Sequence, residues 1–163
     1  MRYALRLSYK GTNYHGWQIQ ENAHSVQAEI NSAIKKVLNH EINSLGSGRT
    51  DTGVHAKEQF MMFDSDQELN SYQHLKSLNA ILPRDISVYN LYLIDDNANL
   101  RFDAIEREYE YRICRKKDPF ERDTSALLFT ELDFEIMNRG AEKLLTQRDF
   151  KSFEKSRTQN KTS

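Results

Sequence analysis

Cysteine and proline are scarce in this chain of 163 residues, and long apolar runs are missing. Cys114 is the only cysteine, so a disulfide within the chain is excluded and a reducing compartment is expected. Only two prolines are present, and no low-complexity stretch precedes the polar tail. No apolar stretch reaches the roughly 20 residues that a membrane-spanning helix needs, so we expect no membrane contact.

Charge and histidine placement narrow the function classes further. The formal net charge is −1, so the chain lacks an overall basic excess for nucleic acid, although a local patch can suffice. The five histidines stand apart and one cysteine is available, which predicts no metal site. Residues 1–5 enter a strand pattern at once and do not resemble a signal peptide, so the cytoplasm is the expected location.

Hydrophobic spacing in the first part of the chain predicts four strands and two helices. The predicted strands cover residues 2–10, 42–45, 58–63 and 86–94. Ser25 is a candidate N-cap for the first helix, and residues 65–68 have the form of a capping box for the second, which Pro83 ends. The order β-α-β-β-α-β predicts an α+β, ferredoxin-like antiparallel sheet with both helices on one face. The other face would be free to bind a ligand, as in several RNA-binding modules.

The remaining residues predict the opening of a second, similar half. We expect a strand over residues 106–114, a helix capped by Asp133 and a short strand over 149–153. The last eight residues are a polar tail with nothing to pack. The sequence thus predicts a ferredoxin-like domain over 1–105 and an incomplete second domain over 106–163, as in a truncated chain.

The loop over residues 46–56 is the strongest candidate for a site. It holds three glycines, and glycine allows tight turns and a close approach of ligand or backbone. Arg49 lies two residues before Asp51, so its positive charge favours the ionised carboxylate that a nucleophile or base needs. By itself, an Asp-Thr-Gly sequence is more typical of a solvated turn.

Residues 48–55 resemble the Gly-Arg-Thr-Asp-Ala-Gly-Val-His signature of the TruA-type tRNA pseudouridine synthases, with Thr52 in place of alanine. Residues 9–18 are similar to that family's early Tyr-(Asp/Lys)-Gly-x-x-Tyr-x-Gly-Trp-Gln motif. The other matches are the helix start at 25–27, Asn-x-x-Leu-Pro at 79–83, the arginine motif at 101–104, Arg-x-Tyr-x-Tyr at 107–111 and Asp-Phe-x-x-Phe at 149–153. These matches run in order over essentially the whole chain.

The resemblance implies an isomerase that converts uridine to pseudouridine in the anticodon stem-loop of tRNA, at positions 38, 39 or 40. It implies Asp51 as the covalent nucleophile, Tyr109 as the residue that stacks on the target base, and Arg49 as the partner that keeps Asp51 ionised or meets a phosphate. No cofactor or metal is implied, because the reaction only rearranges the substrate. Family members are longer homodimers, and nothing here matches the Arg-Asn helix start of their second half.

Other functions remain open at this stage. A half-size aspartic protease shares the Asp-Thr-Gly sequence, but it needs an apolar strand before that motif and an all-β fold. A non-catalytic RNA-binding fragment of a pseudouridine synthase is the stronger alternative, because the chain looks too short to be active. A nucleotide-binding P-loop is weaker, since residues 46–50 lack its lysine and its spacing.

Overall fold

The computed structural model describes residues 1–153, which form two compact units, Met1–Tyr111 and the residues from Arg112 onward. The helices and strands of the first unit are β1 (Arg2–Tyr9), the 3₁₀ turn η1 (Gly11–Asn13), α1 (Val26–Leu38), β2 (Ser44–Gly46), β3 (Ala56–Asp64), α2 (Ser71–Ile81) and β4 (Ile86–Ile94). The second unit contains β5 (Ile113–Cys114), β6 (Ala126–Leu127), α3 (Phe134–Leu145) and η2 (Lys151–Phe153).

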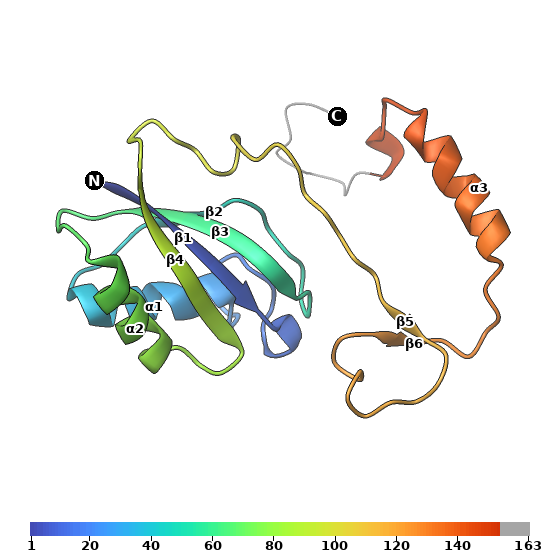
Figure 1. Cartoon of the computed structure of the whole chain (residues 1–163), viewed down its shortest axis with the longest axis horizontal. Helices are drawn as coiled ribbons and strands as arrows, with labels where there is room; N and C mark the ends of the chain where they lie inside the picture. The colour runs from blue at the N-terminus through green and yellow to red at the C-terminus, as the bar shows by residue number, and fades with distance from the viewer. Residues whose placement is uncertain (154–163) are drawn as a thin grey trace. The chain divides into compact units, whose positions relative to one another are not determined.

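The first unit confirms the predicted α+β, ferredoxin-like fold. Its sheet has the strand order β2-β3-β1-β4, and each neighbouring pair is antiparallel. Figure 1 shows α1 and α2 on the same side of this sheet. The alternation predicted for β1 holds, because Tyr3, Leu5, Leu7 and Tyr9 are all at most 3% exposed and lie in the core.

The second helix begins later than the sequence predicts. Its N-cap is Asn70, whose side chain accepts a hydrogen bond from the backbone N–H of Gln73 at 3.0 Å. The predicted capping box at 65–68 is wrong, because the hydroxyl of the buried Ser65 accepts from the Gln67 N–H and donates to the Gln67 carbonyl in a local turn. The predicted end before Pro83 is confirmed, since α2 stops at Ile81.

One side chain of α2 completes the edge of the sheet. The Asn79 amide donates to the Val88 carbonyl at 2.8 Å, and its carbonyl accepts from the Val88 N–H at 3.0 Å. Val88 lies in β4, at the edge of the sheet, so these two bonds take the place of a further strand. This explains the asparagine of the Asn-x-x-Leu-Pro motif in structural terms.

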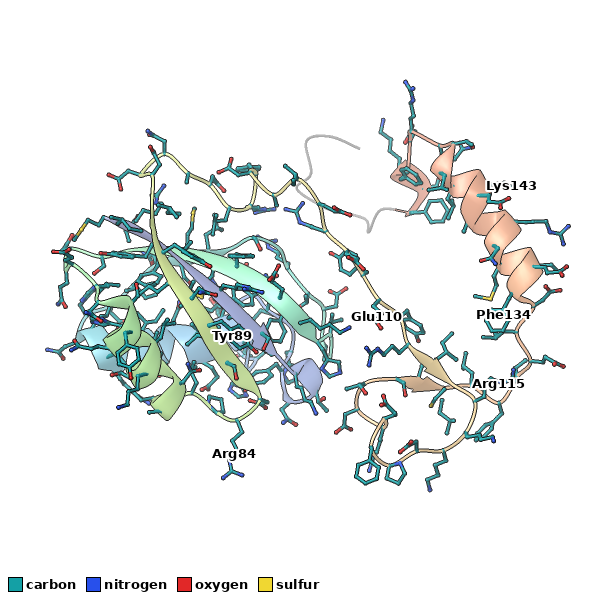
Figure 2. All side chains as sticks on the ribbon, viewed as in Figure 1. Arg84, Tyr89, Glu110, Arg115, Phe134 and Lys143 are labelled. Atoms are coloured by element: carbon teal, nitrogen blue, oxygen red, sulfur yellow. The ribbon has the colours of Figure 1, made fainter. Side chains whose placement is uncertain are left out.

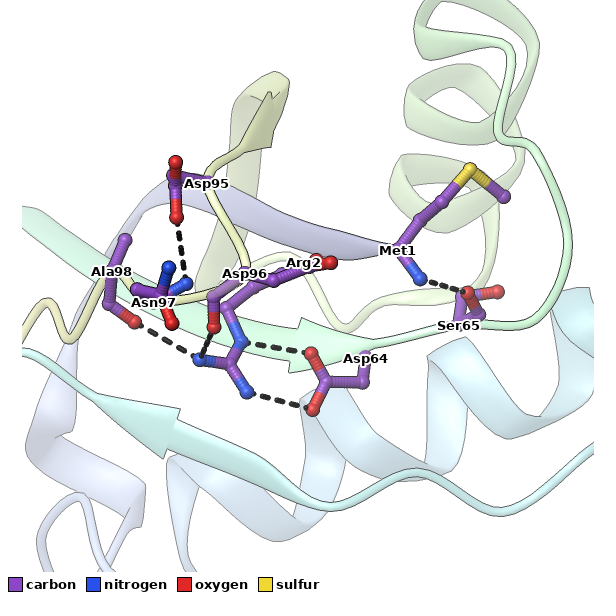
Figure 3. Close-up of polar contacts among 8 residues, drawn as sticks. All are labelled: Met1, Arg2, Asp64, Ser65, Asp95, Asp96, Asn97 and Ala98. Carbon is purple, nitrogen blue, oxygen red and sulfur yellow. Dashed lines mark hydrogen bonds and ion pairs between the residues drawn. The ribbon is translucent and has the colours of Figure 1, made fainter.

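Arg2 joins three parts of the first unit at the end of the sheet (Figure 3). Its guanidinium donates to both carboxylate oxygens of Asp64, at 2.8 and 3.1 Å, and to the backbone carbonyls of Asp96 and Ala98 in the turn after β4. These hydrogen bonds with Arg2 hold the pKa of Asp64 below its usual value.

Two strands predicted after residue 105 are wrong. Only Ile113–Cys114 of the predicted strand 106–114 forms a strand, and it pairs in parallel with β6. The predicted strand 149–153 contains the 3₁₀ turn η2. The helix capped by Asp133 is confirmed, because the Asp133 carboxylate accepts from the Ile136 N–H at 2.9 Å. The polar tail predicted over the last eight residues lies outside the described residues.

The apolar side of α3 is not covered within residues 112–153. No residue of α3 is buried; Phe134 at its start is 62% exposed and Leu145 at its end is 86% exposed. Figure 2 labels Phe134 and Lys143 near opposite ends of this helix. None of the helices within residues 1–153 has the length and apolar character that a membrane span requires.

Candidate active site

The loop over residues 46–56, which we call the glycine loop, joins β2 to β3 and presents Asp51 at the surface. Its start is held by the Ser47 N–H, which donates to the Phe60 carbonyl of β3 at 2.8 Å. Its tip is a turn in which the Val54 N–H donates to the Asp51 carbonyl at 3.2 Å. Gly53 has φ = +80°, the conformation that a type II turn needs at its third residue and that glycine adopts without strain. The turn therefore fixes the backbone on the C-terminal side of Asp51.

The early loop over residues 11–17 packs directly against the glycine loop. The Trp17 N–H donates to the Thr50 carbonyl at 3.1 Å, and the Gly53 N–H donates to the Tyr14 carbonyl at 3.2 Å. A Cβ atom placed on Gly16 would lie 2.3 Å from the Thr50 oxygen, so no other residue fits there without movement. These contacts brace the backbone on both sides of Asp51.

His55 and Gly11 form a further contact between the early loop and the glycine loop. The Gly11 N–H donates to Nδ1 of His55 at 2.9 Å, so this ring nitrogen acts as an acceptor. A Cβ atom on Gly11 would lie 2.0 Å from the Val54 oxygen. The His55 side chain therefore holds the glycine loop to the backbone of the early loop.

The aromatic residues of the early loop anchor it in the core. Trp17 is fully buried beneath Gly46, where an added Cβ would lie 2.4 Å from the indole Nε1. Tyr14 is 2% exposed, and its hydroxyl donates to Oδ1 of Asp85 at 2.7 Å. Burial and this hydrogen bond raise the pKa of Tyr14. Both buried rings therefore attach the early loop to the core.

The first turn of α1 supports the early loop from beneath. The Ser25 hydroxyl caps the helix by accepting from the Ala28 N–H at 3.3 Å. The N–H groups of Val26 and Gln27, which have no partner within the helix, donate to the carbonyls of Gly16 and Trp17, at 3.2 and 3.0 Å. This explains why the motif at 25–27 accompanies the motif at 9–18.

The segment that carries Tyr109 contacts the glycine loop through Arg107, although this segment is not the predicted strand. The Tyr9 hydroxyl makes a hydrogen bond of 2.8 Å with Oγ1 of Thr50, the residue before Asp51. Burial raises the pKa of Tyr9, the hydrogen bond with Thr50 opposes this shift, and the nearby Tyr109 adds to it. The Tyr109 side chain is 76% exposed, as a platform for a base requires.

The structure places Arg49 and Asp51 on the same loop, and both side chains are exposed. Among residues 1–153, no three His, Cys, Asp or Glu side chains gather as a metal site requires.

Arg107 is a contact residue that the sequence alone did not indicate. Its Nη2 donates to the Ser47 carbonyl at 2.9 Å and to the Arg101 carbonyl at 2.8 Å. An added Cβ on Gly48 would meet the Arg107 Nε at 3.7 Å, so the guanidinium lies over the glycine loop. The only signal in the sequence is its place two residues before Tyr109 in the Arg-x-Tyr-x-Tyr motif.

Comparison with known proteins gives consistent matches. The family model described as tRNA pseudouridine synthase matches residues 7–103, which include the early loop and the glycine loop. A protein named tRNA pseudouridine synthase A from Bacteroides thetaiotaomicron is 42% identical over 161 residues, covering 99% of this chain and 60% of that protein. Proteins of the same name from Parabacteroides distasonis and Francisella tularensis subsp. novicida are 40% and 41% identical, with 64% and 63% of their lengths covered. The chain thus spans less than two thirds of these relatives.

Proposed function

The chain belongs to the tRNA pseudouridine synthase family, and from this membership we propose that the protein isomerises uridine in tRNA to pseudouridine. The observation that carries the proposal is the braced glycine loop, which holds the backbone around Asp51 rigidly while leaving its side chain exposed. A rigid loop is what a nucleophile needs, because small displacements of a reacting group lower the rate strongly.

The proposed chemistry needs a nucleophile and no further reactant. The Asp51 carboxylate attacks the substrate at the base or at the sugar, and the bond between uracil N1 and ribose C1′ breaks. The uracil turns, C5 bonds to C1′, and the bond between Asp51 and the substrate breaks, which releases the carboxylate. The proton lost from C5 is balanced by one gained at N1. Atoms and electrons are conserved overall, so neither an oxidant nor a second substrate is required.

Tyr109 and Arg49 have supporting roles in this proposal. The exposed Tyr109 ring offers a surface on which an extruded uracil stacks, which is how enzymes commonly hold a base outside its helix. Arg49 places a positive charge on the same loop as Asp51 and can pair with a nearby phosphate of the RNA.

The finer points of the proposal follow from the resemblance. We propose the anticodon stem-loop as the substrate region, a homodimer as the form of the whole protein, and the cytoplasm as its location. We also propose a catalytic domain over 1–105 and the opening of a second domain over 106–163. The exposed apolar side of α3 supports the last point, because a complete domain buries such a surface.

A non-catalytic RNA-binding fragment is the second candidate. It is favoured by one observation, which is that the chain spans only 60–65% of the relatives it matches. In this form the first unit would bind RNA through the same loops without turnover. The aspartic protease alternative, in contrast, disagrees with the α+β fold.

The experiment that tests the proposal compares Asp51→Ala with a matched control, Asp66→Ala. Asp66 is also an exposed aspartate on a loop, but it lies in the turn after β3. Pseudouridine formation in tRNA is measured by mass spectrometry, and tRNA binding is measured separately, with this chain and with any longer product of the same gene. We expect Asp51→Ala to lower turnover by at least about 1,000-fold with binding retained, and Asp66→Ala to behave like wild type.

The outcomes separate the two candidates. Wild-type turnover by the Asp51→Ala variant contradicts the role of Asp51. Binding without turnover by the unsubstituted chain, together with turnover by a longer product, identifies this chain as a binding fragment.

A further inference from the structure

The segment that carries Tyr109 is held in place by side chains and not by backbone pairing. Between the end of β4 at Ile94 and the start of β5 at Ile113, the described chain forms neither helix nor strand. A segment without a hydrogen-bonded ladder has no intrinsic position relative to the sheet. Something else must therefore set the distance between Tyr109 and the loop that carries Asp51.

Arg107 supplies a direct contact with the glycine loop. A single nitrogen, Nη2, donates to the Ser47 carbonyl at 2.9 Å and to the Arg101 carbonyl at 2.8 Å. The first bond crosses 60 residues of sequence, whereas the second closes the segment on itself. Together they join the stretch before Tyr109 to the stretch before Asp51.

A second contact fixes the other side of Tyr109. The Lys57 ammonium in β3 makes an ion pair with the Glu110 carboxylate, and Figure 2 shows Glu110 on the irregular stretch of chain that follows β4. Both partners are largely exposed, so this ion pair alone contributes little. The bond from Arg107 to the Ser47 carbonyl, in contrast, ties the segment directly to the backbone of the glycine loop.

We propose that Arg107 is a positioning residue, which fixes the ring of Tyr109 relative to Asp51 through the Ser47 carbonyl. Its effect on turnover rests on the proposed function, whereas its effect on the segment does not. Arg107 acts through the backbone and has no direct role in the chemistry. A guanidinium bound to RNA phosphate is the alternative role for an exposed arginine, and the experiment distinguishes the two.

The variants are Arg107→Ala, Arg107→Lys and the control Arg139→Ala, an exposed arginine of α3. Lysine carries three N–H donors on one atom, so it can bond the same two carbonyls, and it should restore much of the wild-type behaviour. Alanine removes both bonds. The control removes an arginine of similar exposure that lies in the second unit.

The first readout is the rate of cleavage by a glutamate-specific protease after Glu106, Glu108 and Glu110. Each rate is divided by that of a synthetic peptide of the same sequence, which removes the effect of the substitution on protease recognition. We expect Arg107→Ala to raise the normalised rate several-fold, with Arg107→Lys and Arg139→Ala near wild type. An unchanged rate for Arg107→Ala overturns the proposal, whether or not the protein is active.

The second readout is turnover of tRNA by the longest product of the gene. We expect Arg107→Ala to lower kcat by about 10- to 100-fold, as a misplaced platform does, with KM and the salt dependence of binding unchanged. A weaker affinity, a reduced salt slope and an unchanged kcat instead identify a phosphate contact and overturn the proposal. If wild type shows no turnover, the proposed function fails and the protease readout alone decides on Arg107.

Discussion

Gly16 and Gly53 offer a test of how tightly the early loop is packed on the glycine loop. Both have positive φ, +85° and +80°, so alanine at either site is strained. At Gly16 an added Cβ also lies 2.3 Å from the Thr50 carbonyl oxygen, whereas at Gly53 nothing lies within 4 Å. The pair Gly16→Ala and Gly53→Ala thus separates steric contact from backbone strain.

The expected magnitudes follow from these distances. Strain at positive φ costs about 1–2 kcal/mol for an alanine, and this is the whole cost expected at Gly53. At Gly16 the Thr50 backbone must also move by more than 1 Å to reach an ordinary contact of at least 3.4 Å. That movement breaks the bond from the Trp17 N–H, and loss of a hydrogen bond with overpacking adds about 2–4 kcal/mol. We therefore expect Gly16→Ala to be the more destabilising by at least about 2 kcal/mol.

The assay is equilibrium unfolding in urea, followed by the fluorescence of Trp17, which is the only tryptophan and is fully buried. Its emission reports directly on the early loop. Equal losses of unfolding free energy in the two variants would refute the tight junction between the loops. A Gly16→Ala protein that fails to fold, beside a folded Gly53→Ala protein, agrees with it.

Three further changes probe the packing around this junction and the sheet. Gly46→Ala is expected to cost about 1–3 kcal/mol in unfolding free energy, because the new Cβ lies 2.4 Å from the Trp17 indole nitrogen. Asn79→Ala should lower it by a similar 1–3 kcal/mol, roughly, since two backbone groups of β4 lose their partners; urea unfolding checks both. The folded pKa of Asp64 is depressed by Arg2, so this pair stabilises the protein above the unfolded pKa near 3.9, and the benefit disappears as pH falls through the folded pKa. The stability difference between wild type and Asp64→Asn should therefore be present at neutral pH and vanish in acid, as measured by urea unfolding across that range.

The first unit could be predicted from the sequence because its signals are local and mutually consistent. The alternating residues of β1, the N-cap Ser25 and the stop before Pro83 each define an element within a few positions. The capping box predicted at 65–68 was wrong because this prediction, too, used only a local pattern. A serine followed by a glutamate three residues later fits both a helix start and a turn, and the burial of Ser65 that selects the turn depends on the whole fold.

The predicted strand at 106–114 was wrong because strand propensity reports how well side chains suit a pleated surface. It does not report whether a neighbouring strand is available to pair with. Alternating tyrosines favour a pleated conformation, but a strand exists only where a neighbouring edge accepts its hydrogen bonds. Within the described residues, only Ile113 and Cys114 find such an edge, in β6. The stretch before them is held by Arg107 and Glu110 instead, and a propensity argument cannot foresee side-chain tethers of this kind.

At the candidate site, the sequence identified individual residues but did not predict how they are arranged. The sequence pointed to Asp51 and Tyr109 through motifs, but gave no reason for the glycines at 11 and 16. The structure gives that reason, because both glycines let one loop touch the backbone of the other. The early motif and the glycine loop therefore form one structural unit, although α1 and β2 lie between them in the sequence. A substitution at Gly16 should accordingly lower turnover by displacing the backbone next to Asp51, even if Gly16 itself does not contact the RNA. This dependence distinguishes a supporting loop from a binding surface.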